Sequence, residues 1–364
     1  MLMAAATVFL LTGLVRRIGL AVGAMTEVRD RDVHITPIPR LGGVAMFGGL
    51  AVGLLVASQF PFIQRVFGRS DDLRALLTGG AVICVIGVID DKWGLDALTK
   101  LAGQILAAGV MVLQGVTLYW LPIPGGTLGL TPAQSTLLTV LVVVVTINAV
   151  NFVDGLDGLA AGVVGIGAAA FFLYSYLLSI EYGLDAATTP ALITVVLTGV
   201  CVGFLPHNFS PARVFMGDSG AMLLGLVLAA SSITLTGQID PNAVSISRSL
   251  LAAMLPLFLP IAVLAVPILD LLLAVVRRRL AGRSPWHPDK QHLHHRLLER
   301  GHSHARAVLL MYGWSATFGF GAVAVSLIDG AWVTLVALAA VVVLSAATVL
   351  LPRLDRPLPG HRVV

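Results

Sequence analysis

The chain has 364 residues, of which 57% are hydrophobic and only 12% are charged, and its formal net charge is +4. Soluble globular proteins carry roughly 25% charged residues, so this chain has too few charges to cover a water-facing surface. The composition therefore excludes an ordinary soluble domain and indicates a multi-pass membrane protein without a nucleic-acid partner.

Long apolar segments run through the whole chain, and a helix needs about 20 apolar residues to cross the hydrocarbon core. Because lipid excludes open strands, we predict an all-α polytopic fold with about eleven transmembrane helices in one domain that covers residues 1–364. The predicted spans are 2–22, 42–60, 73–89, 98–118, 134–153, 159–180, 190–206, 218–236, 250–276, 307–328 and 331–351. The segment 119–133 predicts an interfacial loop or a short hairpin.

The positive charges predict the orientation. If the N-terminus lies outside, only Arg65, Arg69, Arg74 and Arg248 of the 23 lysines and arginines lie outside with it. The positive-inside rule therefore favours an outside N-terminus and a cytoplasmic C-terminus in the inner membrane. In this orientation the polar loops that we expect to form an active site are all cytoplasmic. These loops are 24–41, 90–98, 148–158, 206–218 and 277–306.

The first polar cluster ends the third predicted span with Asp90 and Asp91. Adjacent carboxylates repel each other, and one takes up a proton unless a metal ion or a lysine is near. A helix that starts near Asp96 places Lys100 and Gln104 on one face, four residues apart. A solvated helix end is the alternative interpretation of this aspartate pair.

The second cluster is a glycine-rich run that contains Asn148, Asn151, Asp154, Gly155 and Asp157. Glycines at this density let the backbone approach a ligand closely. Backbone N–H groups in such a turn can bind phosphate or the edge of a base. A plain polar turn with aspartate caps is the alternative.

The third cluster runs from Asn208 to Gly220 and contains Phe215 and Asp218. Asp218 falls at the predicted start of a helix, where the helix dipole favours an ionised carboxylate and so a metal ligand. A simple N-cap is equally compatible with that position. Phe215 could stack on a base or pack between helices.

The fourth cluster is rich in histidine and includes His292, His294, His295 and Arg296. Imidazole and guanidinium groups suit a diphosphate or a sugar. A zinc site is the alternative, but no cysteine or glutamate completes a catalytic zinc set in this segment.

Together these motifs resemble the polyprenyl-phosphate N-acetylhexosamine-1-phosphate transferases over nearly the whole chain and in the same order. The resemblance begins with Pro39-Arg40-Leu41-Gly42-Gly43 and ends with His292-Leu293-His294-His295. The run Asp289-Lys-Gln-His-Leu-His-His-Arg resembles the branch that uses UDP-GlcNAc. The branch that transfers phospho-MurNAc-pentapeptide usually has three consecutive histidines, and it remains an alternative.

The resemblance implies transfer of GlcNAc-1-phosphate from UDP-GlcNAc to undecaprenyl or decaprenyl phosphate, with release of UMP, as the first membrane step of cell-envelope polysaccharide synthesis. It implies Mg²⁺, for which Mn²⁺ could substitute, held by Asp218 and Asn151. Asp90 would position the lipid phosphate and take its residual proton, while Asp91 would support the metal ion or the catalytic Lys100. The prenyl chain would lie in an apolar groove between helices.

The resemblance also implies the residues that bind the donor. The uridine pocket would be formed by Gly155, Leu156, Asp157, Asn208 and Phe215, and Asp157 would also belong to the catalytic group. Asn148 and Asp154 would contact substrate as well. The diphosphate and the sugar would be bound by His292, His294, His295 and Arg296.

A secondary transporter is the alternative from another functional class, because intramembrane acids and broken helices are common in transporters. Transporter charges lie near the bilayer midplane, whereas the acidic residues here fall on one face, and no internal repeat is evident. A homodimer is also left open by the sequence.

Overall fold

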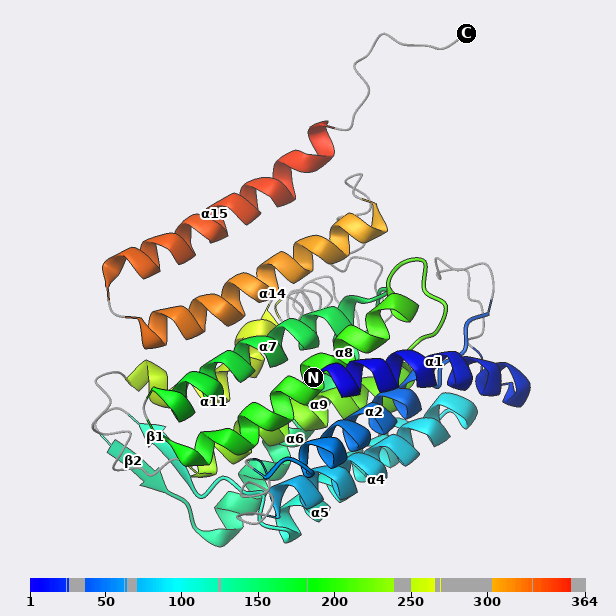
Figure 1. Ribbon diagram of the computed structural model, residues 1–364, viewed down its shortest axis with the longest axis horizontal. Helices are drawn as coiled ribbons and strands as arrows, with labels where there is room; N and C mark the ends of the chain where they lie inside the picture. Colours follow the sequence, from blue (N-terminus) through cyan, green and yellow to red (C-terminus); the bar gives the residue numbers. More distant parts are fainter. Residues whose placement is uncertain are drawn as a thin grey trace, which may run out of the picture.

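The computed structural model describes residues 1–23, 25, 37–61, 63, 71–123, 126–181, 183–238, 250–265, 269, 303–328 and 330–354. These residues form a bundle of helices that run alongside one another (Figure 1). In chain order the helices are α1 (Leu2–Val22), α2 (Gly42–Ala57), α4 (Asp72–Trp93), α5 (Ala97–Leu113), α6 (Pro132–Val153), α7 (Leu159–Ile180), α8 (Thr188–Asn208), α9 (Gly217–Gln238), α11 (Leu250–Val263), α14 (His304–Leu327) and α15 (Ala331–Leu354). A 3-10 turn, η1 (Asp185–Ala187), precedes α8.

In this described part of the chain, eight helices are long and apolar enough to cross a membrane: α1, α4, α6, α7, α8, α9, α14 and α15. The helices α2, α5 and α11 are apolar but shorter. The prediction of a polytopic, mainly helical membrane protein is therefore confirmed. The number of eleven spans and the orientation of the chain stay predictions.

A short antiparallel hairpin joins α5 to α6 and lies at one end of the bundle (Figure 1). Its strands are β1 (Trp120–Ile123) and β2 (Gly126–Gly129), with Trp120 opposite Gly129. A capping box between Thr131 and Gln134 then starts α6. The prediction of a loop or hairpin at 119–133 is confirmed in its hairpin form.

Helix α9 occupies the centre of the bundle, and its whole apolar span is buried. It packs against α2, α4, α6, α8 and α11. A helix that is apolar all round is expected to be buried in this way, and some of its hydroxyl groups have hydrogen-bond partners inside the protein. Ser231 Oγ donates to the Val227 carbonyl at 2.9 Å, and Ser232 Oγ donates to the Pro256 carbonyl at 2.6 Å.

The first turn of α9 packs closely against α2 and α4 at glycine positions of these two helices. A Cβ atom on Gly43 of α2 would overlap the backbone of Ser219 and Gly220, and one on Gly87 of α4 would overlap the backbone of Ser219. Glycine permits this close approach of helices because it has no Cβ atom. The packing therefore fixes where Asp218, which lies in the same turn, can be.

Candidate active site

Two motifs far apart in the sequence lie side by side where α2 and α9 begin. The Phe215 amide donates to the Pro39 carbonyl at 2.8 Å, and the Phe215 carbonyl accepts from the Gly42 amide at 3.0 Å. The Gly43 amide donates to the Met216 carbonyl at 2.9 Å. These backbone bonds explain why the Pro-Arg-Leu-Gly-Gly run and the Phe-Met-Gly-Asp run belong to one site. The stacking role of the Phe215 side chain stays a prediction.

Asp91, near the end of α4, caps the N-terminus of α9. Its Oδ1 accepts from the Asp218 amide at 2.8 Å, and its Oδ2 accepts from the Ser219 amide at 3.1 Å and the Ser219 hydroxyl at 2.8 Å. The first N–H groups of a helix lack partners within the helix, and the dipole there favours a negative charge. Asp91 is buried, so this carboxylate satisfies donors that water does not reach.

Gly217 is required at the turn that leads into this cap. Its φ is +69°, in the left-handed region that favours glycine. A Cβ atom there would also overlap the Arg40 carbonyl oxygen and the Asp91 carboxylate.

Lys100 is the centre of the charged site. Its Nζ lies 2.5 Å from Asp90 Oδ2 and 3.2 Å from Asp218 Oδ1. The other Asp90 oxygen accepts from the Leu95 amide at 2.6 Å, and the Asn151 side chain hydrogen-bonds to Asp218. The ends of α4 and α6 and the starts of α5 and α9 thus meet at one lysine.

The start of α5 places this lysine. The Asp96 carboxylate accepts from the Leu98 and Thr99 amides, both at 3.0 Å, and so caps the helix. Lys100 follows within the first turn and points back to the end of α4. About a fifth of the Lys100 side chain and a quarter of the Asp218 side chain are exposed, against 5% for Asp90. The charged centre is therefore accessible from one side.

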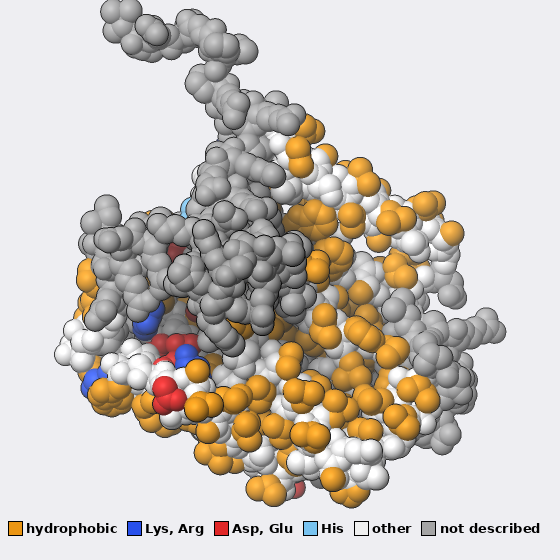
Figure 2. Space-filling view, turned by 180° about the vertical axis from the view of Figure 1, so that it is seen from behind, with side chains coloured by type: hydrophobic (Ala, Val, Ile, Leu, Met, Phe, Trp, Pro, Cys, Tyr) orange, Lys and Arg blue, Asp and Glu red, His pale blue; other side chains and the backbone are white. Residues whose placement is uncertain are grey.

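Asp154 follows α6 and adds a further carboxyl group to this site. Burial, together with the negative charges of Asp218 and Asp91, raises the pKa of Asp154 to about 7, although the positive charge of Arg40 opposes this shift. Carboxylates gathered in this way require a cation to offset their repulsion. Figure 2 shows acidic and basic side chains gathered together at one place on a face that is otherwise mainly apolar.

The oxygen atoms of Asp218 and Asn151 are of the type that binds Mg²⁺. Mg²⁺ prefers oxygen ligands and takes several of them from water and phosphate, and Asp218 and Asn151, which hydrogen-bond to each other, carry a carboxylate and an amide oxygen. Within the described ranges, no group of three His, Cys, Asp or Glu residues is arranged to hold a metal ion by itself. Two oxygen ligands from the protein suit a metal ion that takes its other ligands from water or phosphate.

Asp157 and Asn208 join the two segments that were predicted to bind the nucleotide. Asp157 Oδ2 accepts from the Ala212 amide at 3.0 Å. Asn208 Oδ1 accepts from the Gly158 amide at 3.1 Å, and its Nδ2 donates to the Val214 carbonyl at 3.0 Å. Both side chains are buried, so each holds the shape of these turns. Of their neighbours, Gly155 is exposed and Leu156 is buried.

Asn148 and Asn151 lie on the last two turns of α6 rather than in a loop, because α6 continues to Val153. Asn148 is one turn deeper in the bundle than Asn151. Its Nδ2 donates to Gln104 Oε1 at 2.6 Å and to the Val144 carbonyl at 2.8 Å. The structure thus places Asn148 beside α5 through Gln104, one turn beyond Lys100.

The predicted residues of the fourth cluster, His292, His294, His295 and Arg296, lie outside the described residues. Among the described residues, the sequence analysis gave no role to Leu95 or Ser219, which bond to Asp90 and Asp91, or to Tyr312, whose hydroxyl bonds to the Gly158 carbonyl. Ser219 stands next to Asp218 and could have been suspected as a partner of a carboxylate. Tyr312 stands in an apolar helix without any motif, so the sequence carries no signal for it.

Comparison with known proteins shows the family of this chain. The family described as "Glycosyl transferase family 4" matches residues 73–236, which contain Asp90, Lys100, Asn151 and Asp218. The chain is 50% identical to the decaprenyl-phosphate N-acetylglucosaminephosphotransferase of Mycobacterium tuberculosis over 359 residues. This alignment covers 98% of this chain and 88% of the relative. The chain belongs to glycosyl transferase family 4.

Other members of glycosyl transferase family 4 are more distant from this chain. The probable undecaprenyl-phosphate N-acetylglucosaminyl 1-phosphate transferase of Bacillus subtilis is 30% identical over 321 residues, covering 87% of this chain and 81% of the relative. The phospho-N-acetylmuramoyl-pentapeptide-transferase of Desulforudis audaxviator is 32% identical over 304 residues, which cover 78% of this chain and 82% of the relative. The resemblance inferred from the motifs is confirmed at the level of the family.

Proposed function

We propose that this protein transfers GlcNAc-1-phosphate from UDP-GlcNAc to a polyprenyl phosphate, decaprenyl or undecaprenyl, and releases UMP. The observation that carries the proposal is the Lys100 ammonium held between Asp90 and Asp218 at the ends of apolar helices. The Mycobacterium tuberculosis relative, half identical over almost the full chain, is named for decaprenyl phosphate and for transfer of N-acetylglucosamine phosphate. Its name favours this donor and this lipid.

The main obstacle to the reaction is the repulsion between anions. UDP-GlcNAc has a charged diphosphate, and the second pKa of a phosphate monoester is about 6, so the acceptor is largely dianionic near pH 7. Mg²⁺ bound by Asp218 and Asn151 would neutralise charge on the diphosphate, as in other phosphoryl transfers. Lys100 would reduce the repulsion further from the side of the acceptor.

The residues of the chain would then position the acceptor. Asp90, fixed by the Leu95 amide, would hold the lipid phosphate beside Lys100 and take its residual proton. A lipid phosphate oxygen would attack the sugar-bearing phosphorus of the donor while the bond to UMP breaks. This single displacement inverts the configuration at a chiral phosphorus atom. Retention would instead support a two-step route through an aspartyl intermediate.

A donor screen tests the proposed function directly. The purified protein is incubated with decaprenyl phosphate, Mg²⁺ and either UDP-GlcNAc or UDP-MurNAc-pentapeptide, and the lipid product is identified by mass. We expect GlcNAc-diphosphodecaprenol and an equal amount of UMP from the first donor only. Product from the second donor alone would establish the peptidoglycan alternative, and no UMP release with either donor would favour a transporter.

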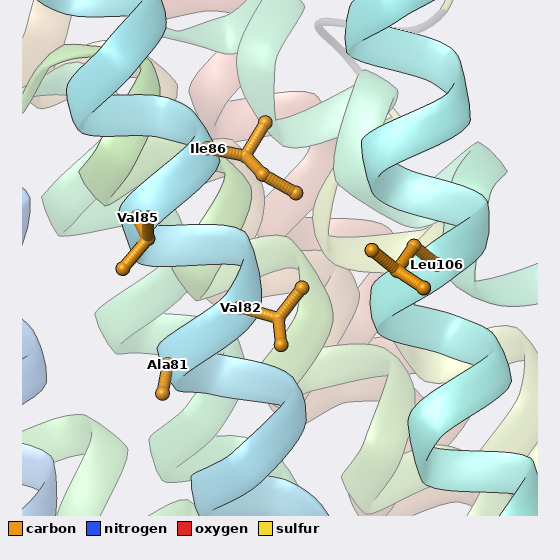
Figure 3. Close-up of a pocket in the computed structure, with 5 residues that line it drawn as sticks. All are labelled: Ala81, Val82, Val85, Ile86 and Leu106. Atoms are coloured by element: carbon orange, nitrogen blue, oxygen red, sulfur yellow. The ribbon is translucent and has the colours of Figure 1, made fainter.

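We further propose that the prenyl chain lies in an apolar groove between α4 and α5. The groove has a volume of about 370 Å³ and is lined by Ala81, Val82, Val85, Ile86 and Leu106. Figure 3 shows Val82 and Ile86 of α4 on the side that faces Leu106 of α5. Ile86 is one turn before Asp90 on the same face of α4. A chain seated there would have its phosphate end near Asp90 and Lys100.

A bulky residue in this groove is expected to weaken binding of the lipid alone. Leu106→Trp should raise the KM for decaprenyl phosphate about tenfold, because each prenyl CH₂ displaced from apolar contact costs about 0.8 kcal/mol. The KM for UDP-GlcNAc should not change. The matched control is Leu137→Trp on α6, where the leucine is 71% exposed. Equal lipid KM values for the two variants would place the prenyl chain elsewhere.

The expected setting is the inner membrane, with the site on the cytoplasmic face where UDP-GlcNAc is found. The distribution of lysine and arginine supports this orientation. The ends of α4, α6 and α8 and the starts of α2, α5 and α9 meet at the site, which is consistent with polar loops on one face. A homodimer remains compatible with this arrangement.

A further inference from the structure

Tyr312 of α14 contacts the glycine-rich turn that precedes α7. Its hydroxyl donates to the Gly158 carbonyl at 2.5 Å, and the same carbonyl accepts from the Gly162 amide at 2.9 Å. A carbonyl oxygen has two lone pairs and can accept both bonds. The Gly158 amide donates to Asn208 on the other side. The last residue of the turn is therefore held from α8 and from α14.

The Tyr312 side chain packs closely against Gly158 and Gly162. A Cβ atom on Gly162 would overlap the Tyr312 ring, and one on Gly158 would lie 3.1 Å from the Phe209 ring and 3.2 Å from the Tyr312 hydroxyl. Gly158 has a φ of +76°, which a larger residue rarely adopts. The ring thus rests on the first turn of α7, in a place that only glycine at position 162 leaves open.

The Tyr312 contact connects α14 to the turn that includes Asp154, Gly155 and Asp157. Of these residues, Asp157 accepts from the Ala212 amide and so holds the backbone of the 208–216 segment. The position of Gly158 therefore affects the predicted uridine pocket. Tyr312 itself is a helix residue that acts only through this turn.

We infer that Tyr312 is a positioning residue for the nucleotide-sugar donor: through Gly158 it fixes the turn against which the uridine end of the donor binds. The inference rests on the proposed function. It adds to the reaction a residue of α14 that belongs to none of the motifs, and it assigns that residue to donor binding rather than to chemistry.

The first test removes only the hydroxyl group. Tyr312→Phe keeps the ring and loses one buried hydrogen bond, so we expect the KM for UDP-GlcNAc to rise about three- to tenfold. The kcat and the KM for the lipid should stay within about twofold, because Asp90, Lys100 and Asp218 are not contacted. The control is Tyr176→Phe on α7, where the tyrosine is 45% exposed.

A second variant reaches the same contact from the other side. Gly162→Ala should displace the ring and raise the donor KM as Tyr312→Phe does. In a Tyr312→Leu background the same Gly162→Ala change should add little, because the two residues act through one contact and their effects are not additive. Full additivity of the two changes would contradict the coupling.

Amide hydrogen exchange of residues 155–162 provides a readout that does not depend on activity. Exchange should be faster in Tyr312→Phe than in wild type and in Tyr176→Phe. Unchanged exchange, or an unchanged donor KM in a folded Tyr312→Phe protein, would overturn the inference. A wild-type protein that forms no GlcNAc-diphospholipid would instead contradict the proposed function, while the exchange comparison still tests the contact.

Discussion

Asp218→Asn is expected to lower the kcat for transfer of GlcNAc-1-phosphate by about a hundred- to a thousandfold, the scale seen when a group that stabilises transition-state charge is lost. The asparagine keeps the shape of the side chain but removes the negative charge that faces Lys100 at 3.2 Å. It would also remove the charged ligand for Mg²⁺. The measurement is UMP release, coupled to detection of the lipid product.

The control for Asp218→Asn is Asp71→Asn, an exposed carboxylate that pairs with Arg74 just before α4. It should have the kcat of wild type. Because the amide side chain leaves the backbone cap of α9 intact, Asp218→Asn should also keep the thermal stability of wild type. A kcat within about tenfold of wild type would remove Asp218 from the reaction.

Asp91→Ala is expected to affect both folding and activity. The change leaves the Asp218 and Ser219 amides without their carboxylate acceptor, and the Ser219 hydroxyl keeps only its longer bond to the Met216 carbonyl at 3.4 Å. Each unsatisfied buried group costs about 1–3 kcal/mol, so the unfolding temperature in detergent should fall clearly. Turnover should fall with it, because the first turn of α9 carries Asp218.

Graded variants separate this capping role from a direct role in chemistry. Asp91→Asn keeps one acceptor oxygen and should lose less stability than Asp91→Ala, and Ser219→Ala, which removes one of the three donors, should lose less again. An Asp91→Ala protein with the unfolding temperature of wild type would contradict the cap.

The positions of the helices could be predicted well from the sequence, because the length of an apolar run is set by the bilayer. The predicted spans 2–22 and 159–180 match α1 and α7. Errors arose where local backbone chemistry ends a helix. The predicted span 98–118 ends as α5 at Leu113, since Gly115 adopts a φ of +94°. The helix α4 continues past the predicted end at 89 to Trp93, so Asp90 and Asp91 lie on the helix itself.

The residues of the charged site could be predicted from the sequence, but the different contacts of Asp90 and Asp91 could not. Asp90 and Asp91 are identical neighbours in sequence, yet successive residues on a helix point about 100° apart. One carboxylate therefore faces Lys100 and the other faces the start of α9. No sequence pattern distinguishes these two directions, because they depend on where α9 packs. The contact of Tyr312 with Gly158 depends in the same way on the packing of α14.

The central place of α9 also has a consequence for how the protein is assembled in the bilayer. Its mean hydropathy over the span is 1.7, against 2.6 for the outermost helix α15, which is only 6% buried. Lipid favours insertion of α15 by itself, whereas α9 depends on its neighbours in the bundle, where Ser219 bonds to Asp91 of α4 and Ser232 bonds to the Pro256 carbonyl of α11. Substitutions along α9 should therefore reduce the yield of inserted protein together with catalysis, so biogenesis and activity share one structural element.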